Sequence, residues 1–421
     1  MYVQHIMLAL VLILGLSLIA QPISRYLRMP YASILVILGF LISELIVYFG
    51  IDTGLRADNF QAIIFYVFIP VLVFESAYNI DKSELKSNLV VILFLAIIAM
   101  ILTCLIAAVL LFYGIGHATG FPWLAALITG AILAATDPVA VVAKLKEMNA
   151  PKRLGVLLEG ESLFNDATAI VLFGLFVSLA TAASEVTETL KAASVIFVVN
   201  DVMLRFTVIF VGGALTGLSV GLLFGFMQKQ VKQVLLTGVM SLVVAYGSYL
   251  LAEYFEVSGI MATLLAALSF SMISQKEQAG SGLPPDKSNN YLWDMLSHVA
   301  NVSVFLVMGA VITLEMFEQR WLAMLIAIFS LLIARAISVY GVLAIFAFFE
   351  NLKVPLASQT VMVWGGLRGA VTLALALSLP TSLEYWWTIQ SIAFGVVIFS
   401  LFVQAPTIQL LVKKLSNKGE S

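Results

Sequence analysis

The sequence predicts an all-α membrane protein whose chain crosses the bilayer thirteen times. Of its 421 residues, 62% are hydrophobic and 11% are charged. A soluble chain is typically about 45–50% apolar and about 25% charged. The apolar residues form segments of about 20 residues, which is the length of a membrane-spanning helix. No alternating ten-residue pattern indicates a barrel, and backbone in lipid must satisfy its own hydrogen bonds, so these segments are expected to be helices.

A window of about 19 residues locates the segments, each bounded by proline, glycine or charged residues. The first segment lacks the basic start and the small-residue cleavage site of a signal peptide, so we expect it to be retained as a span. No connection leaves room for a soluble domain. The thirteen segments are expected near 3–21, 31–49, 60–78, 89–113, 122–143, 155–181, 205–227, 233–252, 257–274, 293–314, 321–349, 358–380 and 386–412.

The basic residues predict the orientation of the chain. If the loops alternate sides, only Arg56, Lys191 and Arg320 fall on one side, with Arg205 at a span edge. Because basic loops stay in the cytoplasm, we expect the C-terminus in the cytoplasm and the N-terminus outside the inner membrane. The other side holds sixteen residues: Arg25, Arg28, Lys82, Lys86, Lys144, Lys146, Lys152, Arg153, Lys229, Lys232, Lys276, Lys287, Lys353, Lys413, Lys414 and Lys418.

Charge and cysteine content exclude several classes of function. A formal net charge of −2 and the absence of a long basic run give no support for nucleic-acid binding. The single cysteine, Cys104, excludes an intrachain disulfide framework and a cysteine metal cluster. No cofactor motif is present, so no cofactor is expected. We expect the chain to be embedded in the lipid bilayer.

Seven charged residues within the predicted spans are candidates for a functional role. Each costs at least ~2.5–3.5 kcal/mol there, and such residues usually mark an ion or proton path. The alternative is a structural ion pair within the bundle. The seven residues are Glu44, Glu75, Asp137, Glu161, Asp166, Arg335 and Arg368.

The densest polar group lies in the sixth span, from Glu159 to Asp166. In a helix, Ser162 and Asp166 share a face, with Glu161 and Asn165 on the adjacent stripe. Hard cations prefer such oxygen ligands. A bare carboxylate is costly in the membrane, so a proton and a cation would compete to neutralise it. This competition is the physical basis of exchange.

Two spans are expected to be interrupted. Pro138 follows Thr136 and Asp137 in the fifth span, and it removes the helical partner of the Ala134 carbonyl. In the twelfth span, three glycines surround Arg368. With the seventh span as a connector, spans 1–6 and 8–13 form two inverted repeats, each with its fifth member interrupted. Paired discontinuous helices of this kind, spans 5 and 12, meet at the transport site of secondary transporters.

These motifs resemble the monovalent cation:proton antiporters of the NhaP and NHE type, over nearly all thirteen spans. The combination of the sixth-span motif with Thr-Asp-Pro about 30 residues earlier is the most specific part of the resemblance. The motifs that carry it are Phe68-Ile69-Pro70 with Phe74-Glu75, Thr136-Asp137-Pro138, Gly160 to Ala167, Ala334-Arg335-Ala336 and Gly365 to Ala370.

The resemblance implies an ion site in which Asp166 binds either the proton or the cation. Ser162, Thr136 and a direct or water-mediated Glu161 would complete the ion shell. It further implies that Asn165 orients the crossing region through Asp137, and its Asn-Asp pair resembles the electroneutral branch of the family.

Two ion pairs are further hypotheses that go with this resemblance. Arg335 is expected to pair with Glu161 and Arg368 with Glu75, and both pairs would support the core rather than ligate the ion.

The resemblance also implies a homodimer. The dimerisation domain would comprise residues 1–88 and 183–318, where 183–318 includes the connector span 7. The core transport domain would comprise 89–182 and 319–421.

The predicted function is one-for-one exchange of Na⁺ or Li⁺ for protons by alternating access, with a K⁺-preferring antiporter as the alternative. A cation channel is less well supported because no selectivity-filter repeat is present. An intramembrane protease is not supported, since the chain lacks the zinc and aspartyl protease motifs. Glu44 is expected to be structural or to lie on the dimer face, and His298 is expected to be a satisfied residue at a helix end, with pH sensing as its alternative.

Overall fold

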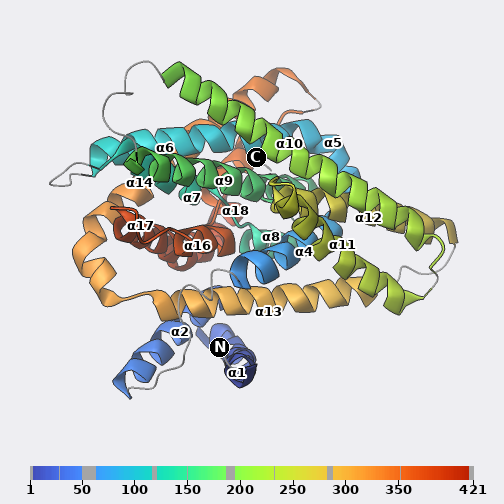
Figure 1. The fold of residues 1–421 in the computed structure, drawn as a ribbon, viewed down its shortest axis with the longest axis horizontal. Helices are drawn as coiled ribbons and strands as arrows, with labels where there is room; N and C mark the ends of the chain where they lie inside the picture. Colours follow the sequence, from blue (N-terminus) through green and yellow to red (C-terminus); the bar gives the residue numbers. More distant parts are fainter. Residues whose placement is uncertain are drawn as a thin grey trace.

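The computed structural model describes residues 3–27, 29–49, 63–115, 121–148, 150–185, 195–231, 233–281, 288–350 and 352–416. Within these ranges, all the regular secondary structure is helical (Figure 1). Long apolar helices leave no backbone group unpaired along their length, which is what a lipid environment requires.

One set of helices packs around α12 and α13. In Figure 1, α10 runs alongside α12, and α2 lies against α13 near the N-terminus. Further contacts join α4 to α12 and to α13, and α11 to α12. The bounds in this set are α1 (Val3–Leu27), α2 (Tyr31–Tyr48), η1 (Ile64–Phe68, a π-helix), α4 (Ile69–Asn79), α10 (Val195–Gln228), α11 (Val234–Tyr254), α12 (Gly259–Ser281) and α13 (Ser288–Val311).

A second set packs around α7, α9 and α14. Helix α6 contacts both α7 and α14, α14 contacts α17, and α7 contacts α9. The bounds in this set are α5 (Lys82–Leu93), η2 (Phe94–Ala99), α6 (Met100–Gly114), α7 (Trp123–Ala134), α8 (Val139–Glu147), α9 (Lys152–Glu185), α14 (Leu314–Ile345), η4 (Phe346–Phe348), α15 (Leu356–Trp364), α16 (Ala370–Leu377), α17 (Trp386–Phe399), η5 (Ser400–Gln404) and α18 (Ala405–Ser416).

Eight helices in the described ranges are long and apolar enough to cross a membrane, and four shorter apolar helices accompany them. The shorter ones are Val11–Leu27, Tyr31–Ile46, Ile64–Asn79 and Gly259–Ser274. Twelve of the expected segments correspond to these helices. The remaining segment, 358–380, is divided between α15 and α16, and neither half is long enough to cross a bilayer alone.

Glycines allow α2 and α13 to pack closely. A Cβ on Gly39 would overlap the backbone oxygen of Leu306, and a Cβ on Gly309 would overlap that of Val36. The Ser43 hydroxyl donates a hydrogen bond across the same contact to the Ala310 carbonyl, at 2.9 Å. In lipid, where helices gain little from the hydrophobic effect, small residues at contacts allow the dispersion and hydrogen bonding that hold helices together.

Replacing Gly309 with alanine tests this contact. The methyl group meets backbone atoms that cannot rotate away, so the Gly309→Ala variant should lose ~1–3 kcal/mol of stability. The measurement is the apparent melting temperature of the purified protein in detergent. Gly341→Ala on α14 is the matched control, because a Cβ there meets nothing within 4 Å. Equal melting temperatures for the two variants would contradict the close packing of α2 on α13.

Candidate functional site

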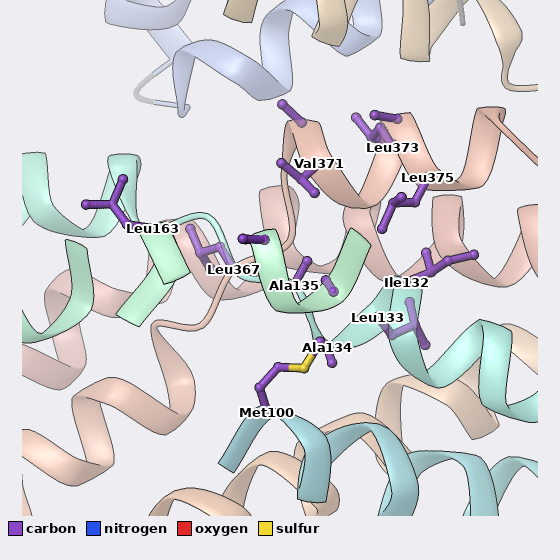
Figure 2. Packing of buried hydrophobic residues seen from close by; sticks show 14 of the residues in the cluster. Met100, Ile132, Leu133, Ala134, Ala135, Leu163, Leu367, Val371, Leu373 and Leu375 are labelled. Atoms are coloured by element: carbon purple, nitrogen blue, oxygen red, sulfur yellow. The ribbon is translucent and has the colours of Figure 1, made fainter. Parts of the chain in front are cut away.

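Two helices are interrupted where the sequence predicts it. Helix α7 ends at Ala134, and α8 begins after Pro138. Helix α15 ends at Trp364, and α16 begins at Ala370 after the glycine-rich segment. Figure 2 shows Ala134 and Ala135 near Leu367, so the two interruptions lie against each other.

Direct hydrogen bonds join the two interruptions. The backbone N–H of Asp137 donates to the Leu367 carbonyl at 2.8 Å. Arg368 Nη1 donates to the carbonyls of Ala135 at 2.8 Å and Ala134 at 3.3 Å. Pro138 has no N–H to offer the Ala134 carbonyl, and the Arg368 guanidinium supplies the missing donor. The buried Arg368 side chain therefore stabilises the interruption that proline introduces into this helix.

The Asp137 carboxylate lies where two half-helices begin. It accepts a hydrogen bond from the backbone N–H of Val139, at 3.1 Å, and another from that of Ala370. These N–H groups belong to the first turns of α8 and α16, whose positive dipole ends favour a negative charge. A Cβ at position 369 would overlap this carboxylate, so only glycine fits there. Asp137 is thus fully engaged in holding the crossing together.

Helix α9 attaches to the crossing through Asn165 and Ser162. Asn165 Nδ2 donates to the Ala134 carbonyl and to Thr136 Oγ1, both at 3.1 Å, while the Ser162 hydroxyl donates to the Thr136 carbonyl. The expectation that Asn165 acts through Asp137 is therefore wrong. The carbonyl freed by Pro138 lies on the side of α9 and needs an amide donor, whereas Asp137 is satisfied by backbone N–H groups.

Asp166 differs from the other acidic residues in the crossing because the described structure shows neither a hydrogen bond nor an ion pair for it. Asp137 accepts hydrogen bonds from two backbone N–H groups, and Glu161, whose oxygens also lack hydrogen bonds, is paired with Arg335. The Oδ1 atom of Asp166 is buried and has no hydrogen-bond partner in the described structure. The Asp166 carboxylate lies within electrostatic reach of Asp137 and of Arg368.

Ser162 lies four residues before Asp166 on the same face of α9, and its hydroxyl proton is committed to Thr136, which leaves its lone pairs available. Oxygen atoms with free lone pairs are what a hard cation requires.

The structure confirms the pair between Glu161 and Arg335. Their charged atoms are in direct contact, and their side chains are only 1% and 3% exposed. Arg335 Nη2 also donates to the Met362 carbonyl, at 3.3 Å, at the end of α15. This pair therefore connects α9, α14 and the second interrupted helix.

The expected pair between Glu75 and Arg368 is wrong. Glu75 accepts hydrogen bonds from Asn79 at 2.9 Å and from Ser297 at 3.4 Å, the latter on α13. Arg368 is instead used by the carbonyls at the interrupted end of α7. A carbonyl buried without a hydrogen-bond donor is costly, as an unpaired carboxylate is, so the carbonyls at the break can take the place of Glu75 as partners of Arg368.

The sequence interpretation did not single out Thr372. It lies on α16, four residues after Arg368, and its buried Oγ1 has no partner in the described structure. Its position in the first turn of the helix that follows the predicted glycine-rich break could have indicated it. Two other expected residues lie away from the crossing: Glu44 is exposed on α2, and the ring of His298 stacks on Tyr31 with centroids 5.8 Å apart.

Sequence comparison agrees with this geometry. Residues 8–414 match the family model described as "Sodium/hydrogen exchanger, transmembrane". The chain belongs to this family. It is therefore a membrane antiporter and not an enzyme.

Relatives of known function match almost the whole chain. The Na⁺/H⁺ antiporter ApNhaP of Aphanothece halophytica is 32% identical over 99% of this chain and 75% of its own length. The Na⁺/H⁺ antiporter NhaG of Bacillus atrophaeus is 31% identical over 93% of this chain and 72% of its own length.

The fold matches that of a solved member of the family. The sodium proton antiporter MjNhaP1 of Methanocaldococcus jannaschii, solved at pH 8, aligns with a TM-score of 0.76 over 98% of this chain and 99% of its own. The sequence identity is 21%, so this comparison shows a shared fold.

Removing one member of the buried ion pair should be more damaging than removing both. Arg335→Met leaves the Glu161 carboxylate buried and uncompensated, which should cost about 3–5 kcal/mol. Adding Glu161→Gln should recover part of this loss. Melting temperatures of the two single variants and the double variant give the coupling between the residues.

Lys144→Met is the control for this cycle. The Lys144–Glu147 pair is exposed, and such pairs contribute about 0–1 kcal/mol. If the Arg335 and Glu161 substitutions were additive, the assigned pair would be refuted.

Proposed function

We propose that this antiporter exchanges Na⁺ or Li⁺ for protons, one for one, with both ions competing for Asp166. The observation that carries the proposal is the unpartnered Oδ1 of Asp166, beside a crossing in which each of the other charged side chains forms a hydrogen bond or an ion pair. A K⁺-preferring exchanger with the same mechanism is the alternative, since the choice of cation depends on fine cavity geometry.

Asp166, Ser162 and Thr136 are the proposed cation ligands. The Ser162 hydroxyl donates to the Thr136 carbonyl, which turns the serine lone pairs away from that bond and leaves them free to accept a cation. Asn165 donates to Thr136 Oγ1 and so fixes the threonine side chain. Glu161 belongs to the site through its position next to Ser162. Because Arg335 holds its carboxylate, we assign Glu161 to supporting α9, with at most a water-mediated contact to the ion.

The charges of the crossing explain why an ion must be bound for passage. Three carboxylates, on Asp137, Glu161 and Asp166, face two guanidinium groups, on Arg335 and Arg368. One negative charge is left over, and either a proton or a monovalent cation neutralises it. Moving an uncompensated charge through low-dielectric surroundings is expensive, so the loaded forms cross and the empty form does not.

This count of the charges in the crossing also supports electroneutral exchange. Asn165 is an amide where a second carboxylate would add another titratable group, and it is used as a hydrogen-bond donor. Asp137 accepts hydrogen bonds from two backbone N–H groups, so we assign it a fixed structural role in the crossing rather than a part in the exchange. One carboxylate then remains to exchange one proton for one cation.

The proposed transport movement is a displacement of the core against the rest of the chain. The core would comprise residues 89–182 and 319–421, and residues 1–88 and 183–318 would form the dimerisation domain of a homodimer. With thirteen crossings in two inverted repeats and the basic loops in the cytoplasm, the N-terminus would lie outside and the C-terminus in the cytoplasm. Support comes from the packing of the helices in two sets and from the opposed interrupted helices.

Asp166→Asn should abolish exchange. The amide has the shape of the carboxylate but neither binds a proton at physiological pH nor carries the charge that attracts a cation. The assay is a pH-reporting dye in inside-out vesicles, to which Na⁺, Li⁺ and K⁺ are added in turn. Exchange should fall to the level of vesicles without the protein.

Glu44→Gln is the matched control for this assay. It removes a carboxylate that the structure exposes on α2, and exchange should remain within about twofold of the unmodified protein. Full exchange by Asp166→Asn would refute the mechanism, and so would a protein that moves no protons with any of the three cations.

The one-for-one ratio is tested by an imposed membrane potential. In vesicles with a K⁺ diffusion potential, the initial rate of Na⁺-driven proton movement should be the same at either sign of the potential. A rate that follows the potential would show net charge movement, and the exchange would not be electroneutral.

A further inference from the structure

A cavity of about 980 Å³ lies beside α9, between the two sets of helices. Its wall includes residues from α9, from η1, from the first half of α10 and from the connection between α11 and α12. Ser378, at the end of α16, also lines it. The cavity therefore borders one of the interrupted helices as well as the helix that carries Asp166.

One stripe of α9 leads from the cavity to Asp166. Ile170, Gly174 and Ser178 line the cavity, and they follow Asp166 at intervals of four residues. Exposure increases along this stripe: Asp166 and Ile170 are partly buried, whereas Gly174 and Ser178 are exposed. Ile170 is one turn, about 6 Å, from Asp166 along the helix axis. In the opposite direction, Ser162 is buried, so access opens towards the C-terminal end of α9.

Two carboxylates from the end of α11 and the turn that follows it line the same cavity. Glu253 lies in the last turn of α11 and accepts a hydrogen bond from the backbone N–H of Gly259, which holds it at the turn into α12. Glu256, in the same turn, has a φ of 55°, in the left-handed region that residues other than glycine adopt uncommonly. Both side chains are exposed. Arg205 also lines the cavity, so the lining residues carry one net negative charge.

We propose that this cavity is the outer vestibule of the antiporter and that Glu253 recruits the cation from it before the cation reaches Asp166. The inference rests on the proposed function and names a second cation-binding residue for it. In the proposed orientation, the C-terminal end of α9 faces the outside.

The position of Glu253 on the cavity wall and its hydrogen bond with Gly259 suit it to recruiting a cation. A carboxylate on the wall of a low-dielectric cavity focuses the field and raises the local concentration of cations. Its hydrogen bond with Gly259 fixes its position but leaves further lone pairs for a cation. An exposed carboxylate binds a hydrated cation only weakly, so the cation is free to continue to Asp166. The apolar residues Ile170, Val171 and Leu175 line the inner part and provide no competing site.

The first test determines whether the cavity opens to the outside, and it does not depend on transport. Ser178→Cys should react with a membrane-impermeant maleimide in intact cells or right-side-out vesicles. The unmodified protein is the blank, because its single cysteine, Cys104, is buried. Ser87→Cys is the control for sidedness, since Ser87 is exposed on α5 at the opposite side of the proposed topology. It should react only in inside-out vesicles.

The second test measures recruitment. In right-side-out vesicles, Glu253→Gln should raise the KM for external Na⁺ by about threefold to tenfold with little change in the maximal rate. The KM measured in inside-out vesicles should not change. Glu315→Gln is the matched control: Glu315 is an exposed carboxylate at the start of α14, outside the cavity lining, and its removal should leave both KM values unchanged.

The outcomes separate this inference from the proposed function. An unreactive Ser178→Cys, or an unchanged external KM in Glu253→Gln, would overturn the vestibule or the recruiting role while exchange itself remains. A lipid-filled groove would give these negative results. An equal rise of KM from both sides would also overturn the inference, because it would place the effect of Glu253 at the central site. Absence of exchange in the unmodified protein would instead defeat the proposed function.

Discussion

The site depends on how the backbone carbonyls at the break after α7 are satisfied. Pro138 deprives the Ala134 carbonyl of its helical partner deep in an apolar bundle, where an unpaired carbonyl costs several kcal/mol. The donors are Asn165, from α9, and Arg368, from the second interrupted helix. The missing hydrogen-bond donor at one carbonyl therefore brings three segments of the chain into contact at a single point.

The remaining polar contacts follow from this arrangement. Once Arg368 is fixed by carbonyls, the backbone around it holds the Asp137 carboxylate between the starts of α8 and α16. Gly369 permits this approach because a side chain there would occupy the place of the carboxylate. Arg335, held by Glu161 and the Met362 carbonyl, supports the crossing from the other side. Asp166 is the remaining carboxylate. Its Oδ1 atom accepts no hydrogen bond from the described residues that would stabilise its negative charge.

Much of this could be predicted from the sequence, because it depends on local chemistry. A proline and a glycine cluster interrupt helices wherever they occur, so both breaks were predictable. The Glu161–Arg335 pair was also correct, since both residues are buried members of a set with few possible partners. The other two contact predictions failed for one reason: they paired side chains with side chains, whereas Arg368 and Asn165 serve backbone carbonyls. The demand of those carbonyls arises from the three-dimensional crossing, and sequence spacing does not display it. Likewise, Glu253 is an ordinary helix-end residue in the sequence, and its cavity forms only when η1, α9, α10 and α11 come together.

The central claim is that a proton and a cation compete for one carboxylate, and calorimetry of the purified protein tests it directly. Na⁺ binding is measured in two buffers that differ in their enthalpy of ionisation, over a range of pH. At the acidic end of the range, the difference in heat should correspond to about one proton released per Na⁺ bound, because the cation displaces the proton from Asp166. The released fraction should fall as the pH rises and the site is already deprotonated. Na⁺ binding that releases no proton at any pH would contradict the account.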